Sequence, residues 1–288
     1  MATVTQICNQ RNNELIISCD FSPPRNNSTN FVEQLTKLDT DFICVSYSPG
    51  KSARVSSNIT AYLINKETGK DVIFNIATRD MNKLALQSSL LGSRTLGLQN
   101  VVVLKGDQFY KNESHIFKEV NDITPTELIN SIQSMNQGHD YKNLTLGKPI
   151  NFCVGATFDL NKGIKSEAEL VLKKVLAGAD FFLAQPVYDI QVIEDFKEIY
   201  KLSTNNELEK PIFYGLQILS NKSSVTFGNV PTSISRDLEN GRDGTAIAIE
   251  WLHKLAKHGI SNFYLIPPIL NNGVRNYEAA QKVIESVR

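Results

Sequence analysis

Several features that would point to particular functions are scarce or missing in this sequence. It carries no surplus of charge, because 30 Lys and Arg residues balance 30 Asp and Glu residues, and no dense basic run is present. Proteins that neutralise a phosphate backbone usually have a surplus of positive charge and a dense run of basic residues, so we expect no nucleic acid partner. No stretch approaches the roughly 18 apolar residues of a membrane span, and the first residues lack the pattern of a secretory signal. We therefore expect a cytoplasmic protein with no membrane partner.

Residue patterns of metal and hydrolase sites are also missing. The four cysteines lie far apart, at positions 8, 19, 44 and 153, and three fall in strand-like runs, which favours reduced structural thiols. The four histidines form no HExxH pattern, so we expect no metal. Without a GxSxG elbow a hydrolase is not favoured. Without a GxGxxG turn, any nicotinamide nucleotide would be held outside a Rossmann crevice.

What the sequence does contain is a repeat of eight apolar runs rich in β-branched and aromatic residues. Most of them, such as VVVL at 101–104, lack polar alternation, which indicates strands buried on both faces. The runs lie at 14–20, 41–46, 71–77, 100–105, 149–156, 180–185, 211–218 and 261–266.

Helical patterns separate these runs. Thr124 with Glu127, Ser166 and Asp189 are start signals for three of the helices. The helical segments lie at 29–38, 57–68, 80–96, 125–136, 166–177, 189–202, 243–258 and 273–287. Strands that alternate with helices in this way predict parallel βαβ units, and eight units predict a (β/α)₈ TIM barrel.

We expect residues 1–288 to form a single barrel domain, in which residues 1–12 are an extended or flexible segment. Two longer polar insertions, at 107–124 and 221–242, follow the fourth and seventh strands. They fall on the face that carries the active site in such barrels, where long loops usually cover the substrate.

Polar side chains collect where the predicted strands end. Asp20 and Asp107 are costly to bury unless they are paired or used, and Gln185 ends a strand that is otherwise apolar. Lys105 is the nearest candidate for a Schiff-base lysine, but its neighbour Asp107 favours the charged ammonium, so contact with an anion is preferred. The full set is Asp20, Ser46, Tyr47, Asn75, Lys105, Asp107, Gln185 and Gln217.

At these positions the chain resembles the flavin-dependent 5,10-methylenetetrahydrofolate reductase family. The segments that carry the resemblance, in family order, are DFSPPR (20–25), CVSYSPG (44–50), VVLKGD (102–107), INFCVGATFD (150–159), KKVLAGADFFLAQPVYD (173–189) and FYLIPP (263–268). The last two segments look most like the reductase part of bifunctional members that also carry a homocysteine methyltransferase domain.

The resemblance implies a role for each matching residue. Asp20 would be the catalytic acid, and Asp107 would reach the folate near the flavin and tune the reaction. Gln185 and Gln217 would bind the substrate on the pterin side. The cofactor FAD would contact Ser46, Tyr47, Asn75, Lys105, Gly106, Asp107, Ala156, Glu167 and Lys174. Hydride from NADH or NADPH would pass through FAD to the folate, giving 5-methyltetrahydrofolate, and the family habit implies a homo-oligomer.

Two residues depart from the family pattern. Asp20 stands where the family has Glu, one methylene longer, and Asn75 stands where many members have His. These changes leave two alternatives open beside the reductase. One is a non-catalytic or partner-dependent paralogue that binds pterin or flavin, and the other is a flavin-free barrel lyase that uses Lys105.

Overall fold

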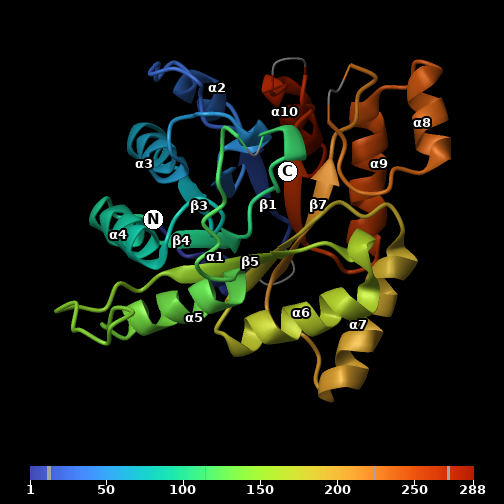
Figure 1. Ribbon diagram of the computed structural model, residues 1–288. Coiled ribbons are helices and arrows are strands. Elements are labelled where there is room, and N and C mark those ends of the chain that lie inside the picture. Colours follow the sequence, from blue (N-terminus) through green and yellow to red (C-terminus); the bar gives the residue numbers. More distant parts are fainter. Residues whose placement is uncertain (12–13, 114, 223–224, 271–272) are drawn as a thin grey trace.

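A closed barrel of eight parallel strands organises the chain (Figure 1). The computed structural model describes residues 1–11, 14–113, 115–222, 225–270 and 273–288. The strands pair in sequence order, and the last pairs with the first, which closes the sheet. The predicted single-domain (β/α)₈ barrel is therefore confirmed. Its strands are β1 (Ile16–Phe21), β2 (Phe42–Val45), β3 (Asp71–Ala77), β4 (Asn100–Leu104), β5 (Cys153–Phe158), β6 (Phe181–Ala184), β7 (Ile212–Gln217) and β8 (Asn262–Ile266).

Strand residues point alternately into the barrel and out toward the helices. On β1, Ile16 packs in an apolar cluster built from several strands, whereas Ile17 and Cys19 pack with residues of the helices. This alternation places Asp20 on the inner face of the barrel, two residues above Ser18. Because both faces are covered, every residue of β1 is buried, as the lack of polar alternation predicted.

The barrel interior is filled by side chains from facing strands. The aromatic rings of Phe42, Phe181 and Phe213 meet edge to face, with centroid distances of 6.4 and 6.3 Å. Gly155 makes room for one of them, because a Cβ atom at this position would lie 2.4 Å from the ring of Phe181. The middle of the barrel is therefore packed, and a ligand can enter only at its ends.

The amino-terminal segment covers the base of the barrel. The expectation of an extended or flexible segment at 1–12 is wrong for α1 (Val4–Gln10), a helix that Thr3 caps. The side-chain oxygen of Asn100, at the start of β4, accepts a hydrogen bond from the backbone N–H of Val4 (2.9 Å). Val4 is fully buried. Burial of apolar surface at the open base, which no periodicity in the sequence announces, explains why these residues fold.

The helices that connect the strands, and the helix after the last strand, form the outer ring (Figure 1). The start signals at Thr124 and Asp189 are confirmed as N-caps, whereas Ser166 lies inside its helix, which begins two residues earlier after Gly163. No helix in the described ranges is long and apolar enough to cross a membrane. The ring consists of α2 (Val32–Thr36), α3 (Ser57–Thr68), α4 (Lys83–Thr95), α5 (Pro125–Asn136), α6 (Ile164–Leu176), α7 (Ile190–Thr204), α9 (Gly244–Lys257) and α10 (Tyr277–Glu285).

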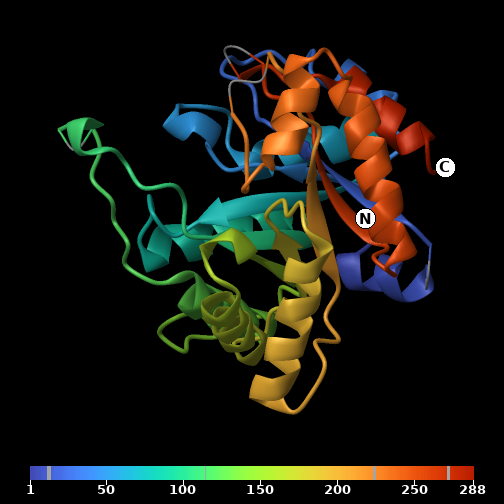
Figure 2. The same ribbon diagram turned by 90° about the vertical axis from the view of Figure 1, so that its right-hand side faces the viewer.

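The two long insertions differ in structure. The first, after β4, extends away from the barrel (Figure 2), and the rings of Phe109 and Phe117 stack within it at 4.8 Å. The second was expected to be a loop, and the structure corrects this, because it contains α8 (Thr232–Glu239). This helix has no buried residue, which is why an apolar pattern did not reveal it.

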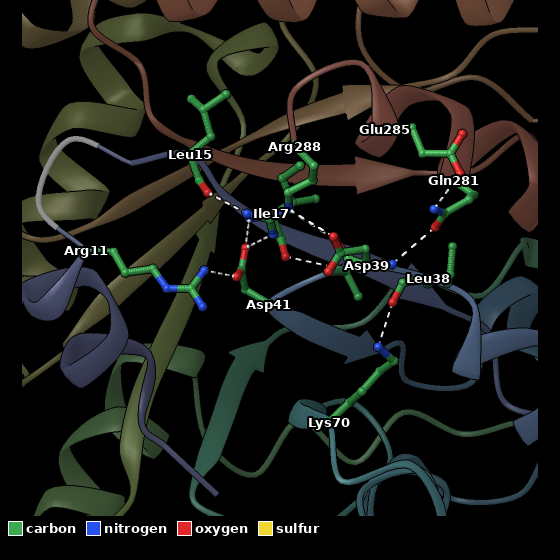
Figure 3. Close-up of polar contacts among 11 residues, drawn as sticks. Arg11, Leu15, Ile17, Leu38, Asp39, Asp41, Lys70, Gln281, Glu285 and Arg288 are labelled. Carbon is green, nitrogen blue, oxygen red and sulfur yellow. Dashed lines mark hydrogen bonds and ion pairs between the residues drawn. The ribbon is translucent and has the colours of Figure 1, made fainter.

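A cluster of charged residues joins both ends of the chain below the strands (Figure 3). Asp41 forms ion pairs with Arg11, just after α1, and with Arg288 at the end of the chain (2.7 Å). The same carboxylate accepts the backbone N–H of Ile17 at 2.7 Å. These contacts link α1, β1 and the carboxyl-terminal segment at the side opposite to the strands' carboxyl ends.

Candidate active site

A polar cavity of about 300 Å³ lies at the carboxyl ends of the strands. Eight of the residues singled out in the sequence line it, and they come from β1, β3 and the segments that follow β2, β4 and β6. These residues are Asp20, Ser46, Tyr47, Asn75, Lys105, Gly106, Asp107 and Gln185. Because the carboxyl ends of all eight strands meet on one face, residues 165 positions apart in the chain come together here.

A second cavity of about 730 Å³ adjoins the first along β5 and α6. The two share four lining residues, Lys105, Thr157, Lys162 and Gln185, and so form one elongated depression. Glu167 and Lys174 line only the second cavity. The twelve site residues proposed from the sequence therefore divide between two adjoining cavities and two positions outside them, which are described below.

Asp20 is buried and held by two partners that the sequence did not reveal. The hydroxyl of Tyr264, on β8, donates to one carboxylate oxygen at 2.6 Å. A guanidinium nitrogen of Arg275 lies 2.7 Å from the other oxygen, as an ion pair without the alignment of a hydrogen bond. Burial, and then the charge of Asp20, raise the pKa of Tyr264 far above its ordinary value, so the phenol stays protonated and acts as a donor.

The Cys44 thiol on β2 lies near this pair, and burial, with the charge of Asp20, keeps the thiol protonated by raising its pKa. The thiol in turn donates to the amide oxygen of Asn75 at 3.5 Å. With the oxygen engaged in this way, the amide nitrogen of Asn75 is left as a donor for the cavity.

The mouth of the cavity carries a second charged group. Arg79, at the end of β3, donates to both carboxylate oxygens of Asp80 (2.6 and 2.7 Å) and to the backbone oxygen of Asp107 (2.6 Å). Burial, with the nearby Asp80 charge, raises the pKa of Tyr47 to about 12. The contacts of Arg79 fix the start of the β4 insertion relative to β3.

Some lining groups are left with hydrogen-bonding capacity. The side chains of Lys105, Asp107 and Gln185 make no hydrogen bond to the described part of the chain, and Lys105 and Asp107 are exposed at the mouth. Between them Gly106 adopts a φ of 90°, and a Cβ there would lie 3.1 Å from the Cβ of Arg79. Glycine at 106 therefore permits the positive φ and lets the segment after β4 pack closely against Arg79 at the end of β3.

Lys174 is a buried amine beside the second cavity. It reaches from α6 to the backbone oxygen of Thr157 on β5. Burial lowers its pKa to about 8, and the neighbouring charge of Glu167 counteracts part of this effect. Glu167 is itself buried and accepts the backbone N–H of Asp159 at 2.9 Å.

Two of the proposed site residues do not face either cavity. The side-chain amide of Gln217 is bonded to the loop that follows β7. Its nitrogen donates to the backbone oxygen of Val225 (2.9 Å), and its oxygen accepts the backbone N–H of Phe227 (2.7 Å). Gln217 therefore holds the loop that brings Phe227 to the cavity. Ala156 is buried in the cluster between the barrel and the helices, so its side chain points away from the cavity.

Sequence reasoning missed several of the lining residues. Thr157 and Tyr264 are found by extending the inward alternation of β5 and β8 by one step, so a signal for them existed. No comparable signal marks residues in segments beyond the strands. The missed residues with polar or aromatic side chains are Ser48, Arg79, Thr157, Lys162, Phe227, Tyr264 and Arg275. In the described ranges no group of three His, Cys, Asp or Glu residues is placed to hold a metal ion.

A (β/α)₈ barrel with a polar cavity at the carboxyl ends of its strands defines the class of barrel proteins that bind small molecules at this face. Within that class, the chain matches the methylenetetrahydrofolate reductase family over residues 4–282. The chain belongs to this family. The resemblance seen in the sequence motifs is thereby confirmed.

Two relatives show how far the similarity extends. The 5,10-methylenetetrahydrofolate reductase of Buchnera aphidicola subsp. Acyrthosiphon pisum (strain APS) is 26% identical over 281 residues, which cover 89% of this chain and 88% of the relative. Methylenetetrahydrofolate reductase (NADH) 1 of Arabidopsis thaliana is 23% identical over 279 residues. That alignment covers 86% of this chain but only 45% of the plant protein.

Solved structures of other proteins share the fold. An uncharacterized protein from Clostridium thermocellum, described as binding two copies of 5-methyl-5,6,7,8-tetrahydrofolic acid, superposes with a TM-score of 0.65 at 16% identity, covering 99% of this chain and 98% of that one. The long-chain alkane monooxygenase LadA gives 0.56 at 9% identity, with 94% and 91% covered. At these identities the likeness concerns the fold alone.

Proposed function

We propose that the protein reduces 5,10-methylenetetrahydrofolate to 5-methyltetrahydrofolate, with electrons from NADH or NADPH and FAD as the cofactor. Two observations together carry this proposal. The chain belongs to the family over residues 4–282, and one cavity is lined by eight of the residues singled out in the sequence, seven of which lie in the motif segments. The relatives from Buchnera and Arabidopsis are named as reductases of this substrate, which supports the same reaction here.

The residues present fit a flavin. Lys105 offers a cation at the cavity, and the amide nitrogen of Asn75 has no acceptor in the described part of the chain, so the phosphates and the polar edge of FAD would find partners. Ser46 and Tyr47 would line the same side, and Glu167 and Lys174 would border the second cavity. When bound, FAD supplies the hydride chemistry that no amino-acid side chain provides.

The folate would be bound by groups that have no hydrogen-bond partner among the residues that the structure describes. Gln185 presents an amide with both a donor and an acceptor free, the combination that a pterin ring requires. Asp107 would place its charge near the reacting centre. Gln217 would act on the substrate indirectly, by holding Phe227 at the cavity.

Asp20 would handle the proton that opens the five-membered ring of the substrate. Its position on the inner face, with Tyr264 and Arg275 on its two oxygens, fixes the carboxylate at the cavity floor. Because Asp is one methylene shorter than Glu, one water would bridge it to the substrate nitrogen. Asp20→Glu tests this arrangement. A higher rate would mean that the longer side chain reaches the substrate nitrogen directly, and a lower rate would mean that the added methylene displaces the carboxylate from its working position.

Spectroscopy of the purified protein tests the whole proposal. We expect a yellow protein whose flavin absorbance is bleached by NADH or NADPH and restored by methylenetetrahydrofolate. A protein that stays colourless and takes up no added FAD would refute the reductase.

The lyase alternative finds less support, because Lys105 is exposed and a Schiff-base lysine needs a desolvated setting. Borohydride trapping with carbonyl substrates tests it directly, and we expect no adduct. The non-catalytic paralogue would instead bind FAD or folate and show no turnover, even with Glu at position 20. We expect the homo-oligomer of the family, which light scattering of the purified protein checks.

A further inference from the structure

The side-chain amide of Asn161 joins three segments at the mouth of the barrel. Asn161 lies in the short 3₁₀ helix η3 (Leu160–Lys162), which follows β5. Its amide nitrogen donates to a carboxylate oxygen of Asp159 (2.8 Å) and to the backbone oxygen of Pro186, after β6 (3.0 Å). Its amide oxygen accepts the backbone N–H of Asn229, in the loop after β7 (3.1 Å). Both ends of this one amide are therefore engaged, each with a partner of the opposite kind.

The loop after β7 also rests directly on the segment after β6. Gly228 has a φ of 73°, and a Cβ at this position would lie 2.4 Å from the backbone oxygen of Pro186. Only glycine allows the two backbones to approach so closely. Gly228 comes directly after Phe227 in the chain. Pro186 comes directly after Gln185, which lines the same cavity as Phe227. The contact therefore sets the separation between the backbones that carry these two cavity residues.

Few other contacts hold this loop in place. Among the residues that the structure describes, three hydrogen bonds tie residues 225–229 to the rest of the protein, two from the amide of Gln217 and one from Asn161. Within this stretch only Phe227 is partly buried, and the other four residues are exposed. Little apolar burial stabilises the loop, so the position of Phe227 depends on these hydrogen bonds.

We propose that Asn161 is a positioning residue that fastens the loop after β7 and thereby holds Phe227 as a fixed wall of the cavity. Asn161 lines neither cavity, so it acts through Phe227. An aromatic wall that is already in place binds a planar ring more tightly, because the ligand does not have to order the loop. The inference deepens the proposed function and rests on it only for the choice of ligand, 5-methyltetrahydrofolate.

Amide hydrogen exchange of the protein without any ligand tests the fastening by itself. The decisive group is the N–H of Phe227, which is bonded to Gln217 and not to Asn161, so it exchanges faster only if the loop opens more often. Asn161→Ala should speed its exchange about fivefold, the effect of one lost hydrogen bond. Asn206→Ala is the matched control, because the Asn206 amide donates to a backbone oxygen two residues away in an exposed turn. Unchanged exchange of the Phe227 N–H in Asn161→Ala would overturn the proposal.

A double-mutant cycle on the affinity for 5-methyltetrahydrofolate tests whether Asn161 acts through Phe227. Phe227→Ala should weaken binding about tenfold, and Asn161→Ala about threefold. In the Phe227→Ala background Asn161→Ala should cause no further loss, since the wall that it positions is gone. Additive losses would show that Asn161 supports the cavity in another way and would refute the positioning role. Gly228→Ala is a second variant, because it pushes the loop away from Pro186 by a different route and should reproduce the effect of Asn161→Ala.

The two measurements separate this inference from the proposed function. If the wild type binds no 5-methyltetrahydrofolate while the Phe227 N–H exchanges faster in Asn161→Ala, the proposed reductase fails and the fastening of Phe227 stands. If wild type and Asn161→Ala bind this folate equally well, the reductase stands and the positioning role fails.

Discussion

Asp20 and Arg275 show how strongly one buried pair determines the cavity floor. Their side chains are 4% and 6% exposed, and they lie 2.7 Å apart. Removing one charge of a buried pair leaves the other without compensation, which is more costly than never having had the pair. The stability of the protein and the geometry of its candidate acid are therefore linked at this position.

Asp20→Asn should lower the free energy of unfolding by about 3 kcal/mol, because the buried Arg275 charge loses its partner. Chemical denaturation of the wild type and the variant measures this. The double variant Asp20→Asn with Arg275→Met should recover part of the loss, since it removes the orphaned charge as well. Additive losses in the double variant would show that the two side chains do not interact.

The buried amine of Lys174 should make the stability of the protein depend on pH. Burial lowers its pKa from 10.5 to about 8, so the unfolded chain binds more protons than the folded one between these two values. The folded state is penalised for the buried charge below pH 8, and this penalty disappears as the pH rises to about 10.5. The stability of the wild type relative to Lys174→Met should therefore increase across that window, by up to about 3 kcal/mol.

Denaturation at several pH values, with Lys174→Met as the reference, separates this effect from other titrating groups. The Met side chain keeps the length and apolar character of the Lys stem. A difference that stays constant from pH 7 to about 11 would mean that Lys174 is not desolvated in the folded protein.

At the scale of elements, the strands depend on small residues where aromatic rings cross the barrel. A Cβ at Gly155 on β5 would meet Phe181 at 2.4 Å and Val102 at 2.7 Å. Gly155→Ala should thus destabilise the protein by about 2 kcal/mol through overpacking. Gly92→Ala is the matched control, because Gly92 lies in α4 with no atom within 4 Å of the added Cβ.

The control should leave the protein equally or slightly more stable, by up to about 1 kcal/mol, because alanine is a better helix former than glycine. Thermal unfolding of both variants checks the pair. Destabilisation of the same size in both variants would contradict the packing argument and point to a general effect of the substitution.

The elements predicted from the sequence are those with a strong apolar period. All eight strands and the outer helices fall within a few residues of the predicted ranges, because burial of one or both faces leaves a pattern in the chain. α1 and α8 were missed for opposite reasons. α1 owes its position to the open base of the barrel, and α8 is a helix without a buried residue.

At the scale of the whole molecule, the barrel explains how much of the site the sequence reveals. The sequence predicts where each strand ends, and so it predicts Asp20, Asn75 and Gln185 as site residues, although it does not show that their side chains line the same cavity. Arg275 lies nine residues beyond the end of β8, and only closure of the barrel brings it to Asp20. Long-range closure of this kind leaves no local signal.

The same closure brings both ends of the chain to Asp41, and this yields a last prediction. Asp41 is 5% exposed, and its partners Arg11 and Arg288 are 39% and 27% exposed, so solvent weakens but does not abolish the two ion pairs. Asp41→Asn keeps an oxygen for the Ile17 N–H and loses both pairs. We expect it to lower the free energy of unfolding by about 1 to 2 kcal/mol, and less in high salt. Glu194→Gln, which breaks the exposed pair with Lys197 on α7, is the matched control and should change stability by less than about 0.5 kcal/mol.

Amide hydrogen exchange should also show faster opening of α1 in Asp41→Asn, because its link to the carboxyl-terminal segment is lost. Equal stability and exchange in the two variants would show that the charged cluster does not hold the base of the barrel together.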